Sequence, residues 1–345
     1  MRTTIQKLTE WAISKIKKEY SDDVALLISV KGATVNGDGH GECFDYFVPS
    51  NDKGKKLGQT FIVEGIGHDL YPRTWERTEN TANLEDRCTL CLGNAEILYS
   101  RTEEDKARFI ELKQRLYDNL KNKEFMYKQS LKQLDIAMDL YRTMMFEDAL
   151  YKVRMAAGYV TDYLSNAIAY LNGTFIYEWK DNKCTSIFDL EDMPDSFIEY
   201  YNGIINARTA EELKNLAHLI IYASRQFIAK HKPYNEQKKT NSNFADLSDW
   251  YQELSLKWRH LSYHCEVNDK IEAFSAACYL QNELNIVKEE FGLAEMNLLG
   301  CFDSENLFAV KEQGLKLEKY IISEIENHGI KINKYNTVEE FLADN

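Results

Sequence analysis

The sequence predicts an α+β protein in which a small mixed-sheet domain is followed by an all-α helical-bundle domain. Half of the 16 glycines and two of the four prolines lie before residue 73, which is typical of a domain with many turns. The run Val24–Val30 is almost wholly apolar, as expected of a strand buried on both faces. After Thr102 the apolar residues recur with a helical period, which indicates that helices follow.

The first domain is expected to begin with a helix, in which Ile5, Leu8, Ala12 and Ile16 form an apolar stripe. A glycine-rich loop, from Gly32 to Gly41, separates the first two expected strands. The full set of strands expected from apolar runs bounded by turn residues is 24–30, 43–48, 59–64, 69–71 and 95–99, with a short helix at 83–92.

The second domain is expected to be helical. Thr102 precedes three acidic residues, a pattern typical of a capped helix N-terminus. Asn172-Gly173 and Lys232-Pro233 are expected breaks between helices. The further helical stretches lie at roughly 125–171, 188–205, 209–231, 245–266, 269–290 and 304–328. We place the domain boundary between residues 115 and 116, which gives domains of 1–115 and 116–345.

Composition narrows the classes of function. The net charge of −13 disfavours general nucleic-acid binding, because an acidic surface repels phosphate backbones. No window approaches the roughly 18 apolar residues of a membrane-spanning helix, and the N-terminus does not resemble a signal peptide. The seven cysteines are odd in number and scattered, as in a protein with free thiols. We therefore expect a soluble, cytoplasmic protein.

Two aspartates stand beside apolar residues on neighbouring expected strands. Asp45 lies mid-strand and Asp69 at a strand end, where a carboxylate is costly unless it binds a metal or a hydrogen-bond donor. Together they could hold Mg²⁺, which prefers oxygen ligands. Gly32 follows the first buried strand, where backbone N–H groups could meet phosphate oxygens. Both features also have a purely structural explanation. The loop would be an ordinary hairpin turn, and each aspartate would be a turn or strand-edge residue without a ligand.

These residues resemble the polymerase-β-like nucleotidyltransferases, which include aminoglycoside and streptomycin adenylyltransferases. Val30-Lys31-Gly32-Ala33 falls where that family has an apolar-Gly-Ser motif, and Cys43-Phe44-Asp45-Tyr46 falls on its Asp-x-Asp segment. Asp69 falls at the third carboxylate. The sequence departs from the pattern at two positions: Ala33 replaces the serine, and Cys43 stands at the first aspartate. The antibiotic-modifying members also carry a helical domain after the catalytic one.

The resemblance implies transfer of a nucleoside monophosphate from ATP or another NTP to a hydroxyl of a small molecule. Asp45 and Asp69 would be the catalytic residues and would hold Mg²⁺, with Asp69 as an alternative general base. Gly32 and Ala33 would bind the nucleotide by letting the backbone approach its phosphates. An acidic cleft would suit a cationic, aminoglycoside-like acceptor.

Two other functions stay open. A neutral thiol is a poor Mg²⁺ ligand, so Cys43 favours a catalytically degraded fold that binds a nucleotide or a protein partner. The large helical part would also fit a scaffold with an α/β appendage. Among weaker signals, Cys88 and Cys91 form a lone CxxC, for which we favour buried or partly buried free thiols over a zinc site. Trp75 could stack on a base or pack under the sheet.

Overall fold

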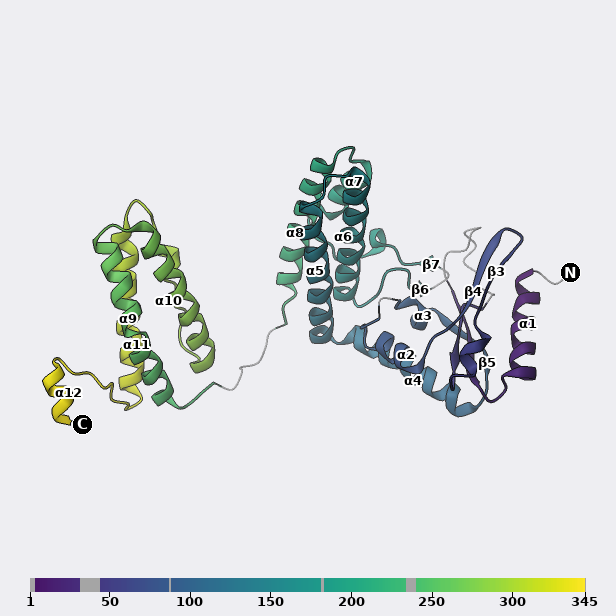
Figure 1. The fold of residues 1–345 in the computed structure, drawn as a ribbon, viewed down its shortest axis with the longest axis horizontal. Coiled ribbons are helices and arrows are strands. Elements are labelled where there is room, and N and C mark those ends of the chain that lie inside the picture. Colours follow the sequence, from purple (N-terminus) through teal and green to yellow (C-terminus); the bar gives the residue numbers. More distant parts are fainter. Residues whose placement is uncertain (1–3, 32–43, 87, 181–182, 234–239, 345) are drawn as a thin grey trace. The chain divides into compact units, whose positions relative to one another are not determined.

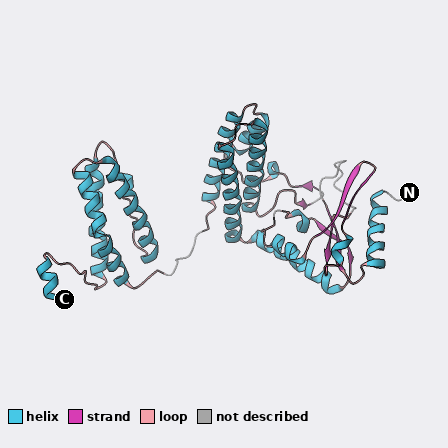
Figure 2. Ribbon diagram, in the orientation of Figure 1, coloured by secondary structure: helices cyan, strands magenta, loops and turns pink. Residues whose placement is uncertain are grey.

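The computed structural model describes residues 4–31, 44–86, 88–180, 183–233 and 240–344 of the 345-residue chain. The chain forms two compact units, Met1–Tyr234 and Asn235–Asn345. The first unit contains a sheet with its covering helices and then a helical bundle, whereas the described residues of the second are helical apart from turns and loops (Figure 2).

The sheet is mixed and has five strands in the order β3-β4-β2-β1-β5 (Figure 1). β2 and β4 run parallel, with Tyr46 beside Tyr71, and the other neighbouring pairs are antiparallel. This arrangement places the start of β2 next to the end of β4. The strands are β1 (Val24–Val30), β2 (Tyr46–Pro49), β3 (Gln59–Val63), β4 (Ile66–Pro72) and β5 (Ala95–Ser100).

Helices cover both faces of the sheet. One face packs against α1 (Thr4–Glu19), whose Ala12 and Ile16 are fully buried in a core shared with Leu27 of β1. The other face packs against α2 (Trp75–Ala82), α3 (Leu90–Gly93) and α4 (Glu103–Lys121). Leu26 and Ile28 of β1 lie in this second core. Alternate residues of β1 therefore point into two cores, which explains its continuous apolar run.

Four further helices complete the first unit: α5 (Lys123–Met145), α6 (Leu150–Leu171), α7 (Phe197–Asn206) and α8 (Ala210–Lys230). Their apolar faces meet in one core, where Ala157, Val160 and Ile220 are fully buried. A short hairpin, β6 (Trp179–Lys180) and β7 (Lys183–Cys184), lies between α6 and α7. Single 3-10 turns lie at Gly54–Leu57 and Ile187–Asp189.

The second unit contains α9 (Phe244–Glu266), α10 (Lys270–Phe291), α11 (Leu307–Asn327) and the short α12 (Val338–Asp344), with a 3-10 turn at Leu299–Cys301. Leu284 and Ile321 are fully buried in its core. The side chain of Asp269 caps α10 by accepting a hydrogen bond from the N–H of Glu272. Among the described helices of the whole chain, none combines the length and the apolar character that crossing a lipid bilayer requires.

The α+β architecture is confirmed, and the described chain after Thr102 contains one short strand pair among its helices. The helix expected over 83–92 was wrong. One helix ends at Ala82, because Leu84 just beyond it adopts a left-handed backbone that does not continue a helix, and the next begins at Leu90.

The boundary expected between residues 115 and 116 falls inside α4. Phe109, Leu112, Leu116 and Leu120 of that helix all lie in the core beneath the sheet. The division into 1–115 and 116–345 stays a prediction, and the two compact units divide at 234/235.

Candidate functional site

The structure brings the two predicted acids to neighbouring strands. Asp45 lies directly before β2, and its N–H donates to the carbonyl of Ile28 at 2.8 Å, which fixes it beside the end of β1. Asp69 lies in β4, the parallel neighbour of β2. Thr60 of β3 donates its hydroxyl to Asp69 Oδ1 at 3.2 Å. Both carboxylates thus sit on the half of the sheet where β2, β4 and β3 lie side by side.

Tyr71 contacts Asp45 and shares β4 with Asp69. Its hydroxyl donates to Asp45 Oδ2 at 3.4 Å, and it lies two residues after Asp69 in β4, so both side chains leave the same face of that strand. Asp45 is half-buried, whereas Asp69 is exposed. Burial raises the pKa of Asp45, and the charge of Asp69 raises it further, while Tyr71 and Arg73 oppose the shift. The two carboxylates therefore repel each other.

A buried guanidinium lies beside this pair. Arg73 is fully buried and follows β4 directly. Its Nη2 donates to Thr81 Oγ1 and lies 3.3 Å from Asp86 Oδ1, and its Cζ lies 5.7 Å from the centre of the Tyr46 ring. Nε and Nη1 have no hydrogen-bond partner among the described residues. Buried donors are nearly always paired, so this arginine is an unusual feature of the site.

The remaining neighbours of Asp45 are neutral hydrogen-bonding groups. Tyr46 donates its hydroxyl to the carbonyl of Cys91 at 2.7 Å, and burial raises the pKa of Tyr46 well above its ordinary value. Burial also raises the pKa of the Cys91 thiol to about 12, and Cys91 Sγ lies 3.9 Å from the Tyr71 hydroxyl. At neutral pH these groups stay protonated, so Cys91 is not a nucleophile here.

The other predicted residues have different outcomes. Gly32, Ala33 and Cys43 lie outside the described residues. Cys88 and Cys91 are free thiols, half-buried and buried, as expected of this CxxC. Trp75 packs against the sheet core, and the Cζ of Arg108 lies 4.3 Å from the centre of its ring.

Sequence reasoning missed Tyr71 and Arg73. Tyr71 was assigned only to a strand, and Arg73 stands between Pro72 and Thr74, where a charged residue is normally exposed. Their proximity in sequence to Asp69 could have marked them as candidates, since both follow it within four residues. Only the parallel pairing of β2 with β4 brings them to Asp45.

Among the residues that the structure describes, the candidate metal ligands of this site are Asp45 and Asp69. Among the described parts of the chain, no cluster of three or more His, Cys, Asp or Glu side chains is suited to hold a metal ion. Any ion at Asp45 and Asp69 would need further oxygen ligands, such as phosphates or water.

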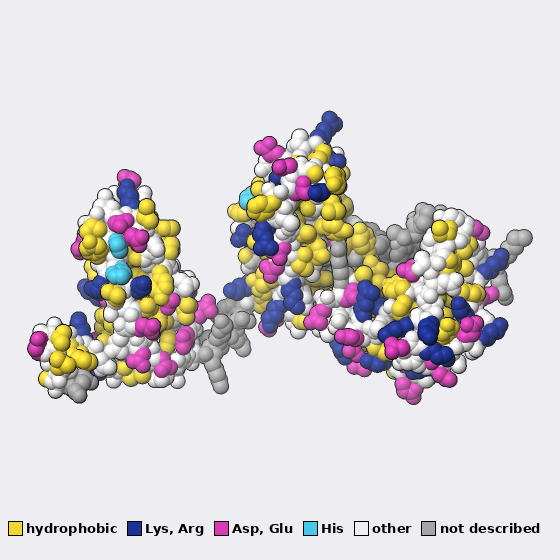
Figure 3. Space-filling view, in the orientation of Figure 1, with side chains coloured by type: hydrophobic (Ala, Val, Ile, Leu, Met, Phe, Trp, Pro, Cys, Tyr) yellow, Lys and Arg dark blue, Asp and Glu magenta, His cyan; other side chains and the backbone are white. Residues whose placement is uncertain are grey.

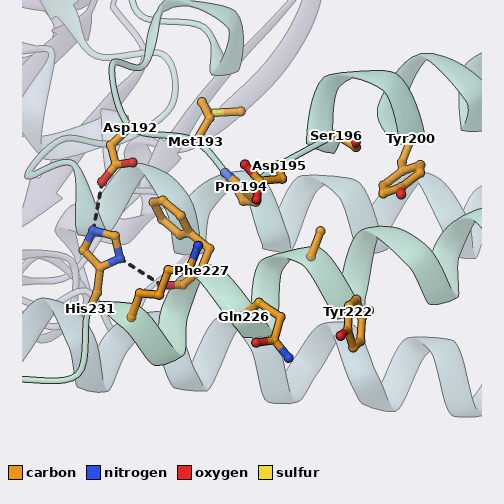
Figure 4. Close-up of a pocket in the computed structure, with 12 residues that line it drawn as sticks. Asp192, Met193, Pro194, Asp195, Ser196, Tyr200, Tyr222, Gln226, Phe227 and His231 are labelled. Carbon is orange, nitrogen blue, oxygen red and sulfur yellow. Dashed lines mark hydrogen bonds and ion pairs between the residues drawn. The ribbon is translucent and has the colours of Figure 1, made fainter.

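A separate cavity of about 410 Å³ lies in the helical bundle, between residues 192–196 and α8 (Figure 4). Its end is closed by His231, whose Nε2 lies 2.9 Å from Asp192 Oδ2 and whose Nδ1 lies 2.9 Å from the carbonyl oxygen of Phe227. Both ring nitrogens are thus engaged, and none of the residues that line this cavity belongs to the Asp45 site.

Comparison with known proteins gives distant likenesses to solved structures. No protein-family model matches the sequence, and no curated protein matches it significantly. A solved structure of a nucleotidyltransferase-like protein from Exiguobacterium sibiricum 255-15 aligns with 64% of this chain and 74% of its own, at 13% identity and a TM-score of 0.34. The site is therefore argued from its own geometry.

Proposed function

We propose that the N-terminal α/β region is a nucleotidyltransferase-like domain that binds an NTP, such as ATP, and transfers its nucleoside monophosphate to a hydroxyl of a small molecule. The observation that supports this most is that Asp69 lies in β4 and Asp45 directly before its parallel neighbour β2, with the Tyr71 hydroxyl of β4 bonded to Asp45. It agrees with the resemblance of the sequence to the polymerase-β-like nucleotidyltransferases.

The two carboxylates fit Mg²⁺. They supply the hard oxygen ligands that this ion prefers, and a cation shared between them would relieve both the burial of the Asp45 charge and its repulsion by Asp69. When bound, the ion would neutralise charge on the triphosphate. Tyr71 orients the Asp45 carboxylate through its hydroxyl, and the nearby Arg73 favours the ionised form that a metal requires.

The two acids differ in exposure, which divides their roles in the proposal. Asp45 is half-buried and held by Tyr71, which suits a fixed ligand. Asp69 is exposed, so an acceptor hydroxyl can reach it, and it would take the proton of that hydroxyl as general base or share the metal. Gly32 and Ala33 would let the backbone approach the phosphates, as the resemblance implies.

One observation favours a second function: the ionised form of Asp45 is disfavoured by burial. Its carboxylate is half-buried and its pKa is raised, while Cys43 replaces the first acid of the family motif. A site with these properties would hold a nucleotide or a protein partner without transfer chemistry. Mg²⁺-independent binding that is lost in Asp45→Asn, without release of pyrophosphate, would support this alternative.

Calorimetry and an activity assay test the proposal together. Wild type, Asp45→Asn and Cys43→Asp are titrated with ATP in Mg²⁺ and in EDTA, and pyrophosphate release is assayed with a panel of aminoglycosides. Asp139→Asn is the matched control, because Asp139 is an exposed acid of α5 paired with Arg142.

We expect Mg²⁺-dependent ATP binding in wild type and Asp139→Asn, its loss in Asp45→Asn, and stronger Mg²⁺ binding in Cys43→Asp. Equal Mg²⁺-linked binding by wild type and Asp45→Asn would contradict the metal site. Metal-linked binding in wild type and Asp139→Asn without pyrophosphate release would contradict the transfer reaction on the acceptors tested.

A further inference from the structure

A second cavity of about 760 Å³ lies at the end of the helical bundle where α4 meets α5 and α8 ends. Four lysines and His231 belong to its lining, and none of the lining residues is acidic. This contrasts with the whole chain, in which 55 acidic residues outnumber 42 basic ones. Figure 3 shows Lys and Arg side chains gathered on the lower part of this bundle. The lysines are Lys121, Lys123, Lys230 and Lys232.

Helix stability explains only part of this basic cluster. Lys121 and Lys230 occupy the last turns of α4 and α8, where a cation interacts favourably with the helix dipole. Lys123 is the first residue of α5, where the dipole disfavours a cation, and Lys232 lies beyond the end of α8. These two positions point to another use of the positive charge.

Three of the four ammonium groups are available to a ligand. Lys121 lies 3.6 Å from Asp118, but Lys123, Lys230 and Lys232 form no ion pair with any described residue. All four lysines are exposed. Mutual repulsion of uncompensated cations around one hollow is unfavourable, and a bound anion would remove it.

The rest of the lining is mostly apolar. Met126 and Tyr170 are buried, and Leu171 and Pro233 are half-buried at the cavity wall. A cavity of this volume is within the range of small-molecule sites, which combine apolar walls with a few charged groups. The lining therefore matches a ligand that has both a multiply charged anionic part and an apolar body.

We propose that this cavity, here called the lysine cavity, binds a phosphorylated small molecule with an apolar or aromatic body, independently of Asp45 and Asp69. The phosphates contact Lys123, Lys230 and Lys232, and the body of the ligand packs against Tyr170, Leu171 and Pro233. The inference does not depend on the proposed transfer reaction, because no residue of the Asp45 site lines the lysine cavity.

Calorimetric titration in EDTA tests the proposal, since the absence of Mg²⁺ excludes metal-linked binding at Asp45. The probes are ATP, inorganic tripolyphosphate and adenosine. The test variant is Lys230→Gln with Lys232→Gln. The control is Lys106→Gln with Lys128→Gln, which removes the same charge from two exposed lysines outside the cavity. Asp45→Asn is titrated in parallel.

We expect ATP to bind wild type, the control and Asp45→Asn with similar affinity. Tripolyphosphate should bind more weakly, because it has no aromatic part to pack against the apolar wall of the cavity. The test variant should lose affinity on the order of tenfold, since charge-assisted contacts to phosphate are lost. Binding should weaken as KCl is raised.

Three results of the ATP titrations would each overturn the inference: no ATP binding in EDTA, equal affinity of the test and control variants, or loss of binding in Asp45→Asn. The last result would assign metal-free binding to the Asp45 site instead. Binding of adenosine as tight as that of ATP would also overturn it, because the lysines would then make no contribution.

Discussion

Replacing Arg73 by methionine tests the buried cluster behind Asp45. Arg73 is fully buried and leaves Nε and Nη1 unpaired among the described residues. Each unpaired buried donor costs about 1–3 kcal/mol. Methionine removes both costs but also loses the hydrogen bond to Thr81 and the ion pair with Asp86, at about 1.5–3 kcal/mol each. Gains and losses are similar in size.

The former partners of Arg73 are not left unpaired by this substitution. Asp86 keeps Arg77 Nε at 2.7 Å and the N–H of Cys88 at 2.9 Å, and the hydroxyl of Thr81 still donates to the carbonyl of Arg77 at 2.9 Å. We therefore expect the free energy of unfolding of Arg73→Met to stay within about 2 kcal/mol of wild type, because Asp86 is not left as an uncompensated buried charge.

Urea denaturation measures this change, and NMR titration of the carboxyl carbons follows Asp45. Because the Arg73 charge lowers the pKa of Asp45, its removal should raise that pKa further. Arg77→Met is the control, since it removes a positive charge from an exposed side chain that does not act on Asp45. A decrease in the free energy of unfolding of more than about 4 kcal/mol, together with an unchanged Asp45 pKa, would contradict this prediction. Such a loss is expected of a fully paired buried arginine, whose removal leaves an uncompensated charge.

Three further predictions follow from single sites. Gly93→Ala should lower the free energy of unfolding by about 1–3 kcal/mol in urea, because its Cβ would lie 2.3 Å from Cζ of the buried Phe175; an unchanged urea midpoint would contradict this. Asp45→Asn should raise the melting temperature at neutral pH. The raised pKa means that stability from Asp45 is present below its ordinary value of 3.8 and lost as pH rises through the folded pKa. The gain should therefore vanish in acid, and a gain that is constant with pH would rule out this cause. Hydrogen bonds from Lys152 and the N–H of Ala149 lower the pKa of Glu147 to about 2, so NMR should show its carboxylate titrating near that pH, and a midpoint close to 4.5 would exclude these bonds.

Local patterns were enough to predict much of the first domain. The continuous apolar run of β1 matches the strand at both ends, because burial on two faces requires apolar side chains at every position. Asp45 and Asp69 stood out as charges among apolar residues. Asp69 lies in β4 as expected, whereas Asp45 lies directly before β2 and not in the middle of the strand. These predictions depended on the residues themselves and their immediate neighbours.

Long-range features could not be predicted in this way. Nothing local indicates that β2 pairs with β4 in parallel, and that pairing is what brings Tyr71 to Asp45. The burial of Arg73 depends on α2 covering the sheet. The division at 234/235 was missed because helical periodicity shows which face of a helix is buried, but not which helix it packs against. The lysine cavity likewise combines residues from three segments, within 120–126, 170–173 and 230–233, that lie far apart in the sequence.

The central claim is that Asp45 and Asp69 together hold a metal ion on an NTP. A crystal structure with a non-hydrolysable ATP analogue and Mn²⁺, with anomalous data collected for the metal, tests it most directly. The account predicts an anomalous peak bonded to both carboxylates and to phosphate oxygens of the analogue. A nucleotide bound with its metal touching neither Asp45 nor Asp69 would contradict it.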